Sequence, residues 1–210
     1  MKLYDAAFAP SPRRVRIFLA EKGITVERIE VDLRADEQRT DPYLRINPRG
    51  AVPALELDSG EVICESAAIC RYFEALQPEP ALFGATPLDT GRVESWTRRI
   101  ESDGYAACVY VFRNARPAFD DRGEPGKWPT IPRIPELAAR GVIMWEAFTA
   151  ALEKRLEGRD WIATDAYSFA DISALVTIDF ARSARLALPD DAANIRRWHE
   201  VASARPSAAA

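Results

Sequence analysis

The sequence predicts a two-domain chain, in which an α/β domain of residues 1–78 precedes an all-α domain of residues 87–210. Strand and helix signals alternate through roughly the first third of the 210 residues, whereas only helical signals follow Gln77-Pro78-Glu79-Pro80. Proline in such density interrupts both periodicities and is typical of a boundary. The length of the chain is compatible with one or two domains and is ample for a proper hydrophobic core.

Apolar periodicity and turn residues place the elements of the first domain. Strands are expected over 2–5, 26–33, 54–57 and 61–64, and helices over 12–22 and 66–76. Asp58-Ser59-Gly60 predicts a hairpin turn between the last two strands. The order βαβ followed by ββα, with Pro53 just before the third strand, is the thioredoxin-like arrangement.

The second domain shows helical spacing only. Helices are expected over 88–116, 134–157, 168–184 and 193–204, and a segment rich in proline and charge separates the first two. Ser168 and Asp171 have the spacing of a capping box, and Tyr167 and Ile172 occupy the positions of a hydrophobic staple around it. We interpret this pattern as a folding signal without chemistry of its own.

Composition and charge argue against several classes of function. A net charge of −4 argues against nucleic-acid binding, because no basic excess is available to neutralise phosphates. No apolar run approaches the ~20 residues of a membrane span, and the first residues lack the regions of a signal peptide. Three cysteines without metal or redox spacing indicate a reducing compartment, so we expect a cytoplasmic protein.

The stretch NPRGAVPAL, from Asn47 to Leu55, carries the clearest functional signal. Pro53 opens an apolar strand although proline deletes a ladder donor, and a cis peptide bond is a leading reason for such a proline. A cis Val52-Pro53 bond would leave the backbone of Val52 free to pair with an extended peptide. The alternative is an ordinary edge-strand proline.

Glu65-Ser66 opens the helix that follows the hairpin. A hydroxyl and free amides at a helix start form an anion site, although a plain helix cap is the alternative interpretation. A peptide-pairing edge beside a carboxylate-binding helix end suits a small peptide such as glutathione.

Four segments together resemble the cytosolic glutathione S-transferases. They are LYDAAFAPSPRRVRIFLAEKGI, NPRGAVPALELDSGEVICESAAICRYFE, YSFADISAL and RRWHEVASARPS, in this order and over nearly the whole chain. The resemblance implies a thioredoxin-like domain, a helical domain and a homodimer. It also implies that Val52 and Pro53 hold the cysteinyl part of glutathione, and that Glu65 and Ser66 hold its γ-glutamyl end.

The position that activates the thiol departs from the family pattern. When the chain is aligned with the family pattern through Arg14-Val15-Arg16, Ala9 occupies the position where a serine or cysteine usually lies. An alanine side chain has no donor with which to stabilise a thiolate. Ser11 is the hydroxyl at the helix entrance, and we predict that it is the catalytic residue; the alternative is that it caps the helix. Tyr4 is a second candidate, although its place in the first strand suggests core packing.

By the resemblance, the first long helix of the second domain faces the site of an apolar electrophile. Tyr105, Phe112 and Arg113 on this helix are the candidate electrophile residues, and core packing of the aromatic stripe is the alternative. Whether Glu101 or Asp103 reaches the glutathione of a partner subunit stays open. His199 is the single histidine, and one ligand makes no metal site.

These observations predict a glutathione transferase that conjugates the thiolate to an apolar electrophile, with no metal. A non-catalytic binding protein of the same fold is the rival, favoured by Ala9. A specialised glutathione-dependent isomerase, dehalogenase or ether-cleaving enzyme is a third possibility, because a fold does not fix its chemistry.

Overall fold

The computed structural model describes residues 1–210. Its contacts divide the chain into two compact units: residues 1–80 with 125–129 and Ala210, and residues 81–124 with 130–209. The first unit is α/β and the second is all-α, as predicted. No helix in the structure has the length and apolar character needed to cross a membrane.

The first unit is built on a four-stranded sheet in the order β2-β1-β3-β4. Its strands are β1 (Lys2–Asp5), β2 (Glu27–Glu30), β3 (Ala54–Glu56) and β4 (Val62–Cys64). Strand β1 pairs parallel with β2 and antiparallel with β3, and β3 pairs antiparallel with β4. This mixed sheet follows from the predicted order, since the crossover between β1 and β2 contains a helix and the hairpin between β3 and β4 does not.

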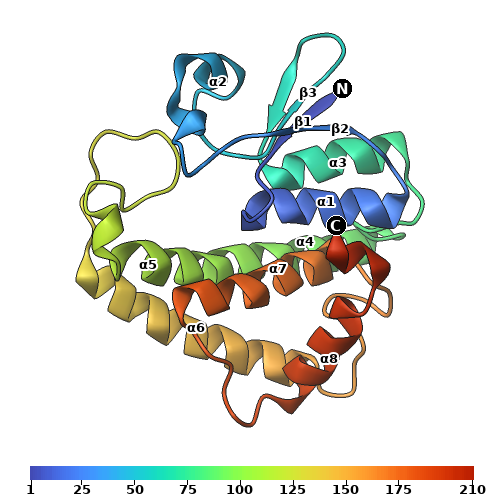
Figure 1. Ribbon diagram of the computed structural model, residues 1–210. Helices are drawn as coiled ribbons and strands as arrows, with labels where there is room; N and C mark the ends of the chain where they lie inside the picture. Colours follow the sequence, from blue (N-terminus) through green and yellow to red (C-terminus); the bar gives the residue numbers. More distant parts are fainter. The chain divides into compact units, whose positions relative to one another are not determined.

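Helices α1 (Pro10–Lys22) and α3 (Ser66–Leu76) pack side by side along one face of this sheet (Figure 1). They run parallel, because Arg14 near the start of α1 contacts Ser66, while Lys22 at its end donates to the carbonyls of Gln77 and Pro78 beyond α3. Fully buried apolar side chains fill the core between helices and sheet: Leu3, Val15, Phe18, Leu55 and Ile69.

Two features of this unit differ from the expectation. Strand β2 is shorter than predicted, because the Asp32 carboxylate accepts from the amides of Arg34 and Ala35 and turns the chain away from the sheet. A short 3₁₀ turn (Glu37–Arg39) and helix α2 (Asp41–Ile46) follow, where the sequence analysis assigned no element. Six residues are too few for a clear helical period.

The second unit consists of helices α4 (Pro87–Arg99), α5 (Ala106–Asn114), α6 (Pro135–Arg155), α7 (Phe169–Ala184) and α8 (Ala193–Ser203). The predicted helix over 88–116 is one helical path, but a π-helical stretch, Ile100–Tyr105, divides it into α4 and α5. Gly104 lies there against Phe148 of α6, and a Cβ at this glycine would meet the ring at 2.7 Å. Glycine therefore permits the close contact that accompanies the widened turn.

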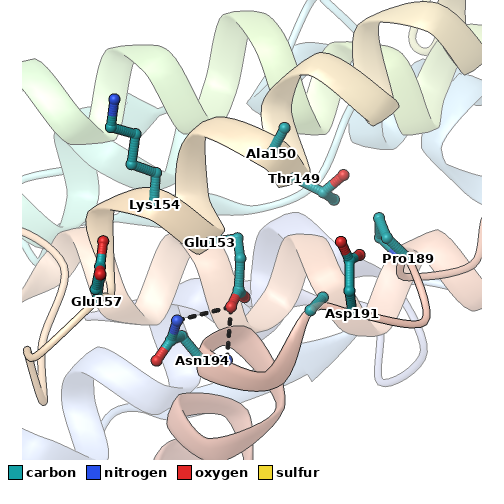
Figure 2. Close-up of a pocket in the computed structure, with 9 residues that line it drawn as sticks. Thr149, Ala150, Glu153, Lys154, Glu157, Pro189, Asp191 and Asn194 are labelled. Atoms are coloured by element: carbon teal, nitrogen blue, oxygen red, sulfur yellow. Dashed lines mark hydrogen bonds between the residues drawn. The ribbon is translucent and has the colours of Figure 1, made fainter.

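Buried polar contacts join the helices of this unit. The Asp171 carboxylate accepts hydrogen bonds from the Ser168 amide and hydroxyl, which confirms the predicted capping motif, and also from the Trp198 indole of α8. Glu153 of α6 accepts from the amide of Asn194 (Figure 2) and from that of Ile195, and so caps α8. Each carboxylate thus satisfies amides at a helix start that would otherwise have no partner.

Candidate functional site

The turn before β3 presents the backbone of Val52. The Tyr43 hydroxyl and the Asn47 amide both donate to the Ala51 carbonyl at 2.7 Å, which fixes the turn. The Val52-Pro53 peptide bond is cis, as predicted. The ladder between β1 and β3 begins only at Ala54, and no backbone hydrogen bond within the chain involves Val52. One strand edge is therefore available to an extended peptide.

The start of α3 places Glu65 and Ser66 beside this turn. Glu65 has φ 73° and its side chain makes no cap bond, so the pair is not a plain helix cap. The Glu65 carboxylate instead accepts from Arg49 Nη1 at 2.9 Å. Arg49 belongs to the same turn as Val52, and this ion pair therefore links the turn to the start of α3.

Ser66 is buried, and Arg14 Nη1 of α1 donates to its Oγ at 3.2 Å. A guanidinium has only donors, so Ser66 Oγ must accept in this bond and keeps its proton for another acceptor. The geometry orients the hydroxyl as a donor at a helix N-terminus, where an anion is favoured. Sequence reasoning missed both arginines, because neither residue has a motif that marks its partner.

The entrance of α1 has few amide donors. Ala9 is the N-cap and offers no side-chain bond, so Ser11 is not the cap and that alternative is wrong. Pro10 and Pro12 flank Ser11 in the first turn, and proline has no N–H. The Ser11 amide and hydroxyl are therefore the donor groups that this turn contains before the Arg13 amide, which donates to the Ala9 carbonyl.

The hydroxyl of Tyr4, the second candidate, already donates to an acceptor within the sheet. Its hydroxyl donates to Glu56 Oε2 at 2.7 Å, and burial together with this carboxylate raises its pKa to about 12. A phenol in this state is a poor donor for a thiolate, since its proton is already shared. Burial likewise raises the pKa of the thiols of Cys64, Cys70 and Cys108, which leaves no activated cysteine.

The candidate electrophile residues lie in the second unit, and the structure brings two of them together. Tyr105 and Phe112 both contact Phe180 of α7, with ring centroids 5.6 and 5.4 Å away, and Phe119 lies 5.4 Å from Phe112. These rings are half-buried and form an aromatic cluster. The sequence analysis did not identify Phe180 or Phe119, because contacts between distant helices leave no local pattern.

Arg113 has a structural role within the same unit. Its Nη1 donates to the carbonyl of Arg122 at 3.1 Å, and its guanidinium covers the Phe119 ring at 4.7 Å. Burial lowers the pKa of Arg113. The residue thus holds the loop after α5 against the aromatic cluster.

The other candidates contact residues of their own helical path or of a neighbouring helix. Glu101 accepts from Arg98 at 2.8 Å, and Asp103 lies 3.9 Å from Arg99. His199 bonds to Asp179 of α7 at 2.8 Å. A separate pocket between α6 and α8 is lined by Glu153 and Asn194 (Figure 2). These two side chains are hydrogen-bonded to each other and connect the two helices.

Comparison with known proteins identifies the family of this chain. The model of the glutathione S-transferase N-terminal domain matches residues 8–76, and that of the C-terminal domain matches residues 146–206. Glutathione S-transferase 2 of Saccharomyces cerevisiae is 32% identical over 99% of this chain and 87% of its own length. Maleylacetoacetate isomerase of Pseudomonas aeruginosa is 32% identical over 99% of this chain and 93% of its own.

A solved structure shares the whole architecture. The glutathione S-transferase domain-containing protein of Marinobacter aquaeolei superposes with a TM-score of 0.89 at 32% identity, covering 99% of each chain. The family models span both units, and these relatives span nearly the full length. The chain therefore belongs to the cytosolic glutathione S-transferase superfamily, and we classify it as a glutathione transferase.

Proposed function

We propose that residues 1–78 form the glutathione-binding domain of this enzyme. The backbone of Val52, set by cis-Pro53, pairs with the cysteinyl residue of glutathione, while Ser66 donates to the γ-glutamyl carboxylate and Glu65 accepts from its ammonium. The observation that carries this proposal is the Val52 backbone without a partner beside the oriented Ser66 hydroxyl. Peptide pairing at an open strand edge is a recurrent recognition mode.

Ser11 stabilises the thiolate in this proposal. Lowering a thiol pKa by about two units requires about 2.7 kcal/mol. A helix dipole typically contributes about 0.3–1 kcal/mol, whereas a hydrogen bond to a charged group contributes about 1.5–3 kcal/mol. The dipole alone falls short, and the two prolines around Ser11 leave few other donors. The hydroxyl of Ser11 supplies the difference.

Residues 87–210 form the domain that holds the second substrate. The half-buried rings of Tyr105 and Phe112 offer an apolar surface for an electrophile, and Arg113 keeps that surface ordered. In conjugation the glutathione thiolate forms a bond to the electrophilic carbon, and the leaving group on that carbon, such as the halide of an aryl halide, departs with its bonding electron pair. We place this activity in detoxification by a cytoplasmic homodimer, with glutathione as co-substrate and no metal.

A specialised glutathione-dependent isomerase is a second candidate, favoured by the isomerase relative at 32% identity. In that reaction the thiolate adds to the substrate and leaves again, so glutathione is regenerated. A dehalogenase or ether-cleaving enzyme would use the same thiolate as a nucleophile. A non-catalytic binder would keep the Val52 and Ser66 contacts and lack thiolate stabilisation.

Binding and turnover separate these proposals. We expect retention on immobilised glutathione, and turnover of a generic aryl halide that falls at least about tenfold in Ser11→Ala, because a charged hydrogen bond is lost. Ser102→Ala, an exposed helical serine of the second unit, is the matched control and should retain full turnover.

Spectroscopic titration of bound glutathione tests the thiolate directly. A thiolate that persists well below pH 8 supports the enzyme, and a normal thiol supports the binder. Unchanged turnover in Ser11→Ala would reject Ser11 and leave a backbone amide or ordered water in its place. A wild-type protein that does not bind glutathione would reject the function itself.

A further inference from the structure

A short segment from the loop between α5 and α6 belongs to the glutathione-binding unit. Residues Pro125–Pro129 group with residues 1–80 in the division of the chain, whereas the residues on both sides group with the helices. The Trp128 indole donates to the Pro125 carbonyl at 2.8 Å and closes this segment into a turn. We call residues 125–129 the strap.

The strap is bound to the turn that precedes Val52. The Lys127 amide donates to the Arg49 carbonyl at 2.6 Å. Gly126 has φ 96°, and a Cβ at this position would lie 2.7 Å from the same carbonyl. A side chain at Gly126 would therefore push the strap away from Arg49, so the glycine is required for the contact.

Side chains of the strap extend this contact. The Cβ of Lys127 would lie 3.1 Å from a Cβ built on Gly50, which has φ 57°. The Arg49 guanidinium covers the Trp128 ring at 5.9 Å while it bonds to Glu65. The strap thus touches the same arginine that links the Val52 turn to the start of α3.

Arg49 and Lys127 are the two cations at this contact, and they differ in whether an acidic side chain pairs with them. Arg49 is paired with Glu65, whereas Lys127 is exposed and forms no ion pair in the structure. Gly50 precedes Val52 by two residues, a span of at most about 7 Å, and an extended tripeptide spans about 10 Å. Lys127 is therefore a cation within reach of a tripeptide bound at Val52.

Glutathione carries two carboxylates, and the proposed function occupies only the γ-glutamyl one, with Ser66. We infer that Lys127 is a further glutathione-binding residue, which the strap holds beside the Val52 turn to pair with the glycyl carboxylate. This inference rests on the proposed glutathione site. It assigns recognition of one end of the tripeptide to a segment whose neighbours in sequence belong to the helical unit.

A comparison of two ligands tests the assignment. Calorimetry with glutathione and with its glycyl monoethyl ester, which lacks that negative charge, is carried out on wild type and on Lys127→Met. We expect Lys127→Met to lower the affinity for glutathione about five- to tenfold, as for the loss of a partly screened charge pair. The affinity of the ester, already weaker in wild type, should stay the same.

Two further variants keep the result interpretable. Gly126→Val, which displaces the strap, should reproduce the selective loss of glutathione with an unchanged far-ultraviolet spectrum. Lys154→Met, an exposed lysine of α6, should leave both affinities unchanged. Equal losses for both ligands, or no loss in Lys127→Met, would overturn the assignment of Lys127. A wild-type protein that binds neither ligand would instead overturn the proposed function and the inference with it.

Discussion

Helices α3 and α7 each begin beside a serine and a carboxylate, but they use these groups in different ways. At α7 the Asp171 carboxylate is fully buried and accepts from the Ile162 amide, from Ser168 and from the Trp198 indole. At α3 the Glu65 carboxylate is about two-thirds exposed, caps nothing and bonds to Arg49. Ser66 is oriented as a donor by Arg14.

We interpret this difference as that between a folding site at α7 and the proposed glutathione-binding site at α3. The donors around Asp171 are bonded to it, so no group there is left to recognise a ligand. The start of α3 has a strained backbone at Glu65 and an uncapped first turn, and strain of this kind is common at functional sites. Variants at the two starts should therefore change stability in one case and ligand affinity in the other.

The largest expected effect is on stability at the start of α7. Asp171→Ala removes the acceptor of four hydrogen bonds and leaves buried donors without a partner, at about 1–3 kcal/mol for each unsatisfied group. We expect the free energy of unfolding in urea to fall by about 3 kcal/mol or more. Asp89→Ala, at the exposed start of α4, is the control and should cost about 1 kcal/mol. Equal losses would contradict the role of burial.

The pH dependence of stability reports on the same carboxylate. Burial raises the pKa of Asp171 to about 6 in the folded protein, against an ordinary value near 3.9. The folded state thus binds the proton more tightly, so this contribution to stability is present below about pH 4 and is lost as the pH rises through 6.

Wild type should therefore lose about 2 kcal/mol of unfolding free energy between pH 4 and 6 relative to Asp171→Asn. Urea titrations at several pH values measure this difference. Asp89→Asn serves as the control and should follow wild type. A wild-type protein that gains stability relative to Asp171→Asn over this range would show that the hydrogen bonds outweigh the burial.

At the start of α3 the main effect should be on binding. Ser66→Ala removes the proposed donor to the γ-glutamyl carboxylate, so glutathione binding should weaken about tenfold, the loss of a hydrogen bond to a charged group. Unfolding should change by only about 1–2 kcal/mol, from the lost Arg14 contact. Calorimetry compares this variant with Ser173→Ala, a buried serine of α7 that should not affect affinity.

The smallest expected effect has opposite signs on stability and binding. Glu65→Gly relieves the positive φ and should stabilise the fold by about 1 kcal/mol, while glutathione affinity falls with the lost carboxylate. Arg185→Gly relieves a positive φ at the end of α7 and should stabilise similarly without changing affinity. A loss of stability in Glu65→Gly would mean that the Arg49 ion pair outweighs the strain.

Local sequence patterns were sufficient to predict most of the helices and strands. The limits of α3 and the Ser168–Asp171 motif were predicted closely, because capping residues and apolar spacing act within a few residues. The cis bond at Pro53 was also predicted from a proline in an apolar strand. Helix α2 was missed, because six residues carry too short a period, and the π-helical stretch depends on the packing of Phe148 against Gly104.

The sequence by itself determined the two kinds of domain, the Val52 turn and the helix starts at Glu65 and Ser168, since each depends on neighbouring residues. Tertiary structure alone decided the partners: Arg14 at Ser66, Arg49 at Glu65 and the strap at Arg49. These contacts join residues separated by 16, 52 and 78 positions. Such partners meet only after the sheet and helices have brought them together. A pattern among neighbouring residues therefore does not predict contacts between residues so far apart in the sequence.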